Sequence, residues 1–164
     1  MPKTLLIMRH AKSSWKETEL DDHARRLNKR GQRDAPAMGA LLRAQGLTPD
    51  AILCSTALRA RETAAAVAEA CGFGGDISYH AGFYNAAPEA YFEALARLPG
   101  AVGVALLVAH NPGVEALLAD LTGEDEPFAT GTVAQVTLAL ADWAQLSLAT
   151  EGGLTNLWRP REID

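Results

Sequence analysis

The sequence predicts an α/β fold: a three-layer sandwich in which a mostly parallel central sheet carries helices on both faces and ends in an antiparallel C-terminal edge. Short continuous apolar runs, typical of strands buried on both faces, occur at residues 5–8, 51–54 and 102–108. Segments with helical periodicity lie between these runs, and this alternation is typical of βαβ units. From residue 132 the apolar residues instead recur at every second position, which indicates a half-buried edge strand.

The first helical segment is expected at residues 28–45. Asn28 is a suitable N-cap, and Gly46 is a suitable stop. Pro36 lies inside the segment, and an interior proline loses a hydrogen bond and clashes with the preceding turn. We therefore expect a kink in this helix, or a second start at Asp34.

The later elements continue the alternation. Residues 60–71 carry an apolar stripe that ends at Gly72, a suitable C-cap. Residues 88–98 and 112–121 predict two further helices, each beginning at a proline suited to the first turn. The predicted C-terminal strands are residues 132–140 and 154–158, paired across Gly152 and Gly153.

Length and charge restrict the class of protein. The 164 residues fit a single domain, predicted to span residues 1–164. A formal charge of −5 argues against nucleic acid or an anionic membrane as the main partner, because both select basic surfaces, so any anion site has to be local. No apolar run approaches the ~20 residues of a membrane helix. The apolar run near the start is too short for a secretory signal, and two cysteines in apolar patterns are typical of free thiols, so we predict a cytoplasmic protein.

Polar clusters follow each of the three buried strands. They are Arg9-His10, residues 55–59 and His110-Asn111. In parallel α/β sheets the ligand crevice lies beyond the carboxyl ends of the strands, so the fold is expected to bring all three clusters to one edge.

Two histidines and two arginines at one crevice predict an anion site that contains a nucleophile. The planar arginine fork matches phosphate oxygens and does not deprotonate. Neighbouring cations lower the pKa of a histidine and keep one ring nitrogen unprotonated near neutral pH. Attack of that nitrogen on phosphorus would form a phosphohistidine intermediate, with the arginines stabilising charge on the phosphoryl oxygens.

Three ordered motifs carry a resemblance to a known family. RHA at residues 9–11, STALRARETA at 55–64 and AHNPG at 109–113 are similar to the motifs of the histidine phosphatase, or phosphoglycerate-mutase-like, superfamily. RHAKSSW at 9–15 and DDHARRLNKRG at 21–31 resemble its SixA-type phosphohistidine phosphatase branch in particular. The similarity extends over nearly the whole chain and implies a phosphoglycerate-mutase-like fold.

The resemblance implies roles for four residues and a chemistry that needs no metal or other cofactor. His10 would be the nucleophile, Arg9 and Arg59 would bind the phosphoryl group, and His110 would complete the pocket. Ala11 stands where the superfamily usually has Gly, which is common in this branch. The residues that either line the substrate mouth or only solvate the loop are Lys12, Ser13, Ser14 and Arg25; Asn111 either caps the following helix or faces the phosphate.

The proton donor of larger family members has no clear counterpart in residues 82–93. Glu89 and Asp21 remain possible donors. An alkyl phosphate expels an alkoxide, whose conjugate acid has a pKa of roughly 15.7 and which needs an acid to protonate it, whereas the leaving imidazole of phosphohistidine has a pKa of about 6.5. A weak or missing acid therefore favours protein phosphohistidine as the substrate.

Other functions stay open at this point. A phosphatase of small phosphate esters and a catalytically silent module that binds phosphate, sulfate or a partner protein are the alternatives. A zinc site is disfavoured because adjacent arginines would repel the metal. The loop from Cys54 to Arg59 has one residue too few, and no glycine, for a cysteine phosphatase loop.

Overall fold

The computed structural model describes residues 2–16 and 21–163, and its centre is one six-stranded sheet of order β3-β2-β4-β1-β5-β6. Neighbouring strands run parallel from β3 through β2 and β4 to β1, whereas β5 is antiparallel to β1 and β6 is antiparallel to β5. This confirms the predicted mostly parallel sheet with an antiparallel C-terminal edge. The strands are β1 (Lys3–Arg9), β2 (Ala51–Ser55), β3 (Ile77–His80), β4 (Val104–Ala109), β5 (Val133–Leu138) and β6 (Gly152–Trp158).

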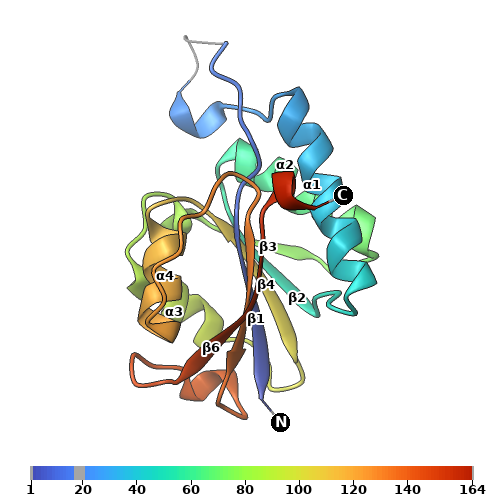
Figure 1. Cartoon of the computed structure of the whole chain (residues 1–164). Coiled ribbons are helices and arrows are strands. Elements are labelled where there is room, and N and C mark those ends of the chain that lie inside the picture. The colour runs from blue at the N-terminus through green and yellow to red at the C-terminus, as the bar shows by residue number, and fades with distance from the viewer. Residues whose placement is uncertain (1, 17–20, 164) are drawn as a thin grey trace.

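Helices cover both faces of the sheet, as Figure 1 shows, with α1 and α2 on one face and α3 and α4 on the other. Alternate side chains of β1 divide between the two cores: Leu6 and Met8 pack with residues of α1 and α2, and Leu5 and Ile7 pack with residues of α3 and α4. Burial on both faces explains why this strand has a continuous apolar run. The helices are α1 (Lys29–Ala44), α2 (Leu58–Cys71), α3 (Pro88–Ala96) and α4 (Gly113–Thr122).

Helix α1 confirms the predicted cap but does not restart at Asp34. The Asn28 side chain accepts a hydrogen bond from the Gly31 backbone N–H at 2.9 Å, and one helix continues through Pro36. The helix packs tightly against α2, since a Cβ on Gly39 would lie only 2.7 Å from the carbonyl oxygen of Val67.

Strand β3 is absent from the sequence-based prediction. Its four residues are half-buried or exposed at the open edge of the sheet, so they carry no continuous apolar run. The predicted turn at Gly152 and Gly153 is wrong, because both glycines lie in β6 opposite Leu138 and Thr137. A Cβ on Gly152 would approach the Leu121 carbonyl oxygen to 2.8 Å, so glycine serves here for close packing with α4 rather than for a turn.

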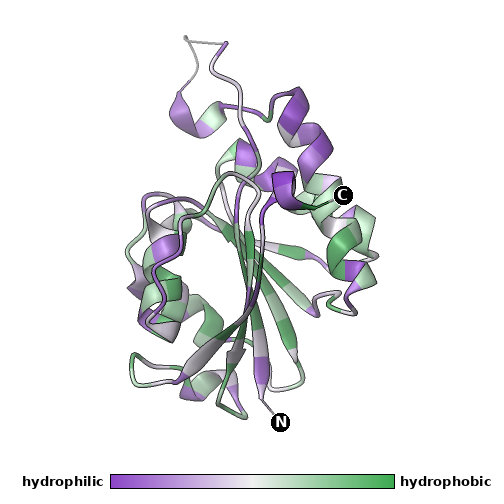
Figure 2. Ribbon diagram, in the orientation of Figure 1, coloured by the Kyte–Doolittle hydropathy of each residue, from purple (hydrophilic) through white to green (hydrophobic). Residues whose placement is uncertain are grey.

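Strands β1, β2 and β4 end at the same edge of the sheet (Figure 1). Figure 2 shows apolar strands below this edge and a strongly hydrophilic end of the molecule above it, which includes the start of α1. In the part of the chain that the structure describes, no helix has the length and apolar character needed to cross a membrane.

Candidate active site

Two histidine rings face one another beyond the ends of β1 and β4. His10 follows β1 and His110 follows β4, and these parallel neighbours pair Arg9 with Ala109. The ring centroids are 5.2 Å apart with an interplanar angle of 53°. Only 5% of His10 and 6% of His110 is exposed. Strand register therefore brings together two residues that are far apart in the sequence.

One ring nitrogen of His10 forms a hydrogen bond, and the other is free. Nδ1 lies 2.7 Å from the backbone carbonyl oxygen of Ala11, which can only accept a hydrogen bond. Nδ1 therefore carries the proton, and Nε2 keeps its lone pair. Burial lowers the pKa of His10 to about 3, and the neighbouring charges of His110, Arg59 and Arg9 act in the same direction. The ring is neutral near pH 7 and has the tautomer that suits a nucleophile.

His110 is fixed from the side of β2. Its Nε2 lies 2.7 Å from the hydroxyl oxygen of Ser55, the last residue of β2. Burial lowers the pKa of His110 to about 4, with Arg59 as the next cause. Its Nδ1 is buried and has no hydrogen-bond partner among the described residues.

The two predicted arginines each keep an unpaired N–H. Arg9 donates from Nη1 to the Phe128 carbonyl at 2.9 Å, and Arg59 donates from Nη1 and Nη2 to Asp22. Their buried Nε atoms, like His110 Nδ1, find no partner in the described chain. A buried polar group left unpaired costs about 1–3 kcal/mol. All three residues line the same hollow of about 260 Å³, and two guanidinium groups beside two imidazole rings make it suited to a compact anion.

Asp22 joins the cations at the mouth of this hollow. Its Oδ1 accepts from Arg25 Nε at 3.0 Å, and its Oδ2 accepts from Arg59 Nη2 at 2.9 Å and from the Tyr84 hydroxyl. The Tyr84 hydrogen bond, followed by the charge of Arg59, lowers the pKa of Asp22 to about 2. The same bond raises the pKa of Tyr84, whose ring lies edge-on to His110 with centroids 5.5 Å apart.

Sequence reasoning missed Asp22 and Tyr84. Asp22 stands three residues before Arg25, a spacing that permits an ion pair within one turn, and this signal could have found it. Tyr84 lies within residues 82–93, where only acidic residues were considered. Nothing in the sequence pairs these two positions, because 62 residues separate them.

Most of the predicted substrate-binding residues lie at the hollow. Arg25 Nη1 donates to the Ser13 hydroxyl at 2.7 Å, while Ser14 contributes its backbone carbonyl to Arg25 at 3.4 Å and does not line the hollow. Asn111 does not cap α4; its Nδ2 donates to Glu115 and to the Phe128 carbonyl. The lining residues are Arg9, His10, Lys12, Ser13, Trp15, Asp22, Arg25, Arg59, Asn85, His110, Asn111 and Thr130.

The two possible proton donors lie outside this lining. Glu89 is in the first turn of α3, and Asp21 is an exposed residue before the short helix Asp22–Ala24. In the described ranges 2–16 and 21–163, no group of three or more His, Cys, Asp or Glu side chains is placed to hold a metal ion.

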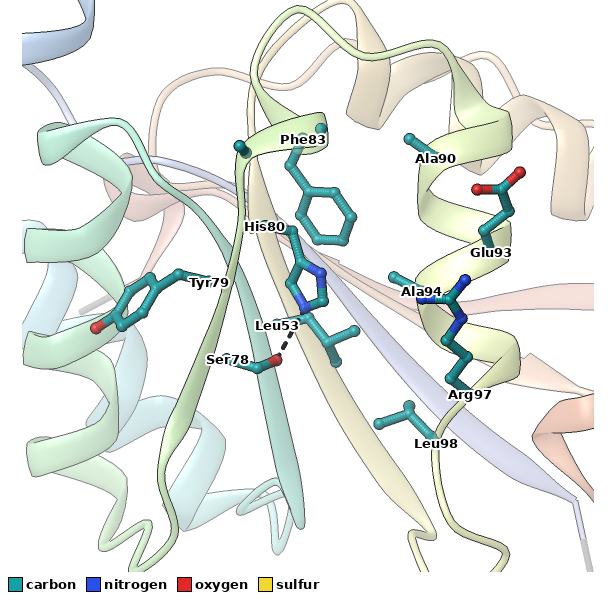
Figure 3. A pocket seen from close by; sticks show the side chains of 12 residues that line it. Leu53, Ser78, Tyr79, His80, Phe83, Ala90, Glu93, Ala94, Arg97 and Leu98 are labelled. Carbon is teal, nitrogen blue, oxygen red and sulfur yellow. Dashed lines mark hydrogen bonds between the residues drawn. The ribbon is translucent and has the colours of Figure 1, made fainter.

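A larger hollow of about 530 Å³ lies between β3 and α3, and Figure 3 shows its lining. There His80 Nε2 lies 3.0 Å from the Ser78 hydroxyl, and the His80 ring stacks on Phe83. Neither His10 nor His110 reaches this hollow. The two histidines and two arginines predicted to act together line the smaller hollow, of about 260 Å³.

Comparison with known proteins agrees with this geometry. The family described as the histidine phosphatase superfamily (branch 1) matches residues 5–84. An uncharacterized protein of Mycobacterium tuberculosis is 37% identical over 150 residues, which cover 85% of this chain and 91% of that protein. The chain belongs to the histidine phosphatase superfamily, and its fold and family are those of a phosphatase.

Two solved structures indicate the branch of the superfamily to which the chain belongs. A structure from Agrobacterium tumefaciens that carries the name SixA is 31% identical, with a TM-score of 0.82 and coverage of 98% of this chain and 99% of that one. Another from Nakamurella multipartitia is 28% identical, with a TM-score of 0.86 and coverage of 98% and 97%. Within the superfamily, this protein lies in the SixA-type branch.

Proposed function

We propose that this protein is a phosphohistidine phosphatase, which moves a phosphoryl group from a histidine of a protein substrate to His10 and then to water. The observation that carries the proposal is the state of His10. A neutral ring with a free Nε2 lies at a hollow that is also lined by the cations Arg9 and Arg59.

The reaction divides into two displacements. The Nε2 lone pair of His10 attacks phosphorus, the P–N bond of the substrate breaks, and the departing imidazole keeps the bonding pair and takes a proton from solvent. Water then attacks the phosphoryl group, the P–Nε2 bond breaks, its electron pair returns to Nε2, and the water proton passes to solvent. Arg9, Arg59 and His110 stabilise charge on the phosphoryl oxygens in both steps.

The proposed preference for phosphohistidine depends on which acids in the site could protonate the leaving group. Among the described residues that line the hollow, Asp22 supplies the carboxyl group. Its pKa of about 2 keeps this group ionised at neutral pH. The raised pKa of Tyr84 keeps its proton on the phenol, in a hydrogen bond to Asp22. Neither group is a suitable acid for a departing alkoxide. An imidazole, with a pKa of about 6.5, departs with far less help.

The test compares wild type with His10→Ala on a histidine-phosphorylated phosphocarrier protein, on 1-phosphoimidazole, on the aryl ester p-nitrophenyl phosphate and on the aliphatic ester glycerol 3-phosphate. Each assay is run without added metal and again with a chelator. We expect turnover of both P–N substrates, insensitivity to the chelator, and a loss of at least about 1,000-fold in kcat for His10→Ala. The matched control is His80→Ala, which removes a histidine that lies outside the hollow.

Three results would contradict the proposal. Unchanged turnover in His10→Ala would remove the nucleophile, and a strong preference for aliphatic phosphate esters would remove the substrate argument. Binding of phosphate without turnover of any of these compounds would indicate a silent binding module. In the wild type, brief exposure to a P–N substrate should also place a phosphoryl adduct on His10, detectable by mass spectrometry.

A further inference from the structure

Two chain segments lie side by side at the mouth of the hollow and are strongly basic. Ser13 pairs with Leu27 in an antiparallel bridge, and the Ser14 N–H donates to the Arg26 carbonyl at 2.8 Å. The sequences are KSSWK at residues 12–16 and RRLNKR at residues 25–30, with six cations and no acidic residue, in a chain of net charge −5; the sequence ETELDD between them, residues 17–22, carries four acidic residues. Arg25 pairs with Asp22 and Arg30 with Asp34, whereas Lys16 and Lys29 are exposed, pair with no carboxylate among the described residues, and extend the positive charge outward.

An exposed tryptophan lies at the centre of these segments. Trp15 is 67% exposed, although it lines the mouth of the hollow. The guanidinium carbon of Arg25 lies 3.5 Å from the centroid of the indole ring, and Arg25 is itself buried and held by Ser13 and Asp22. The stacked arginine therefore orients the indole while most of its surface stays in contact with solvent.

This arrangement has the composition of a protein-binding surface. Tryptophan and arginine are enriched among the residues that dominate binding energy. When a partner covers an exposed indole, the burial of its apolar surface stabilises the complex. The hollow of about 260 Å³ is smaller than the roughly 300–1,000 Å³ of sites that enclose a drug-sized ligand. It suits a phosphoryl group and an imidazole ring, so the remainder of a larger substrate must rest on the rim.

We infer that residues 12–16 and 25–30, with Trp15 at their centre, form a docking surface for the protein that carries the phosphorylated histidine, and that this partner presents acidic side chains around that histidine. The inference rests on the proposed function. Charge complementarity favours an acidic partner. Lys12, Trp15 and Arg25 belong both to this surface and to the lining of the hollow, so a partner seated here delivers its phosphohistidine to His10.

The experiment compares two substrates that share the reacting bond. One is a histidine-phosphorylated phosphocarrier protein with an acidic surface, and the other is 1-phosphoimidazole. We expect Trp15→Ala to raise KM for the protein about tenfold more than KM for phosphoimidazole. Lys16→Glu, a change outside the hollow, should raise KM for the protein alone, and more strongly at low salt. Leu148→Ala removes a side chain of similar exposure, 69%, away from this surface and should change neither KM.

Fluorescence supplies a second measurement. Trp143 is fully buried and Trp158 is half-buried, so acrylamide should quench mainly Trp15. In His10→Ala, which holds the substrate without turnover, the phosphoprotein should protect Trp15 from the quencher. This measurement and Lys16→Glu keep the test decisive if Trp15→Ala does not fold.

Several outcomes overturn the inference. Equal losses on both substrates would mean that Trp15 only orients Arg25, and no loss on either would mean that nothing docks here. Inhibition by a single-stranded oligonucleotide that Trp15→Ala abolishes, with protein KM unchanged, would assign the surface to nucleic acid. If the wild type turns over neither substrate, the proposed function itself fails. Turnover of both with unaltered KM in the variants refutes docking alone.

Discussion

Asp22 holds the Arg59 guanidinium at two points. Arg59 Nη2 donates to the Asp22 carboxylate at 2.9 Å, and Nη1 donates to the Asp22 carbonyl at 2.5 Å. Both terminal nitrogens are therefore engaged on the side of Asp22, and the buried Nε has no partner among the described residues. The contact joins the short helix Asp22–Ala24 to the first turn of α2, which positions Arg59 across the pocket.

Asp22→Ala should lower kcat/KM about tenfold or more, because Arg59 loses a charge-assisted hydrogen bond and its fixed orientation. The inhibition constant for orthovanadate, measured with the same preparation, should rise in parallel. Asp50→Asn is the matched control, since Asp50 accepts from the backbone N–H groups of Gly103 and Val104 at 3.0 Å, at the start of β4, and does not line the hollow. An Asp22 variant with wild-type vanadate affinity would show that Arg59 needs no such support.

Ser55→Ala should reduce kcat by about tenfold and change KM little, because His110 loses the hydroxyl that orients its ring. Ser78→Ala provides the comparison, since it removes a hydroxyl bonded to His80 outside the hollow. Steady-state kinetics with 1-phosphoimidazole measure both variants. If the two serine variants behave alike, the His110 contact has no role in positioning.

Stability should fall as the pH drops below about 6.5. Burial lowers the pKa of His10 to about 3 and that of His110 to about 4, so between these values and 6.5 the unfolded chain binds more protons than the folded chain. The contribution of the two neutral histidines to stability is complete above about pH 6.5, the pKa of a histidine in the unfolded chain. It is lost as the pH falls toward their pKa values in the folded chain. Urea unfolding at pH 7 and pH 5 should show a smaller difference for His10→Gln than for wild type. An identical difference in the two proteins would contradict the lowered pKa.

Gly31→Ala should destabilise the protein by about 1–3 kcal/mol and lower activity. A Cβ at this position would overlap the Lys12 carbonyl oxygen, so the substitution pushes residues 12–16 away from the start of α1. Gly74→Ala is the control, because a Cβ there meets nothing within 4 Å. Thermal unfolding and turnover of 1-phosphoimidazole measure the two effects. Wild-type stability in Gly31→Ala would show that this segment adapts freely.

The central strands were predictable because burial on both faces leaves a continuous apolar run, as in β1, β2 and β4. The same rule explains the failure at β3, whose edge position leaves its residues half-buried or exposed. It also explains the misplaced turn at Gly152, where glycine allows close packing of a strand on α4. The periodicity of apolar residues indicates which faces of a helix or strand are buried. It does not indicate which other element packs against those faces.

The order of apolar runs along the chain was enough to predict the fold class and the polar clusters that follow the buried strands, since parallel strands place their carboxyl ends at one edge. The orientation of these groups follows from contacts that form when the chain folds. The free Nε2 of His10 depends on its hydrogen bond to Ala11, and the support of Arg59 depends on Asp22. Tyr84 reaches Asp22 from 62 positions away. Such contacts arise from packing between distant segments, and a local pattern of residues carries no signal of them.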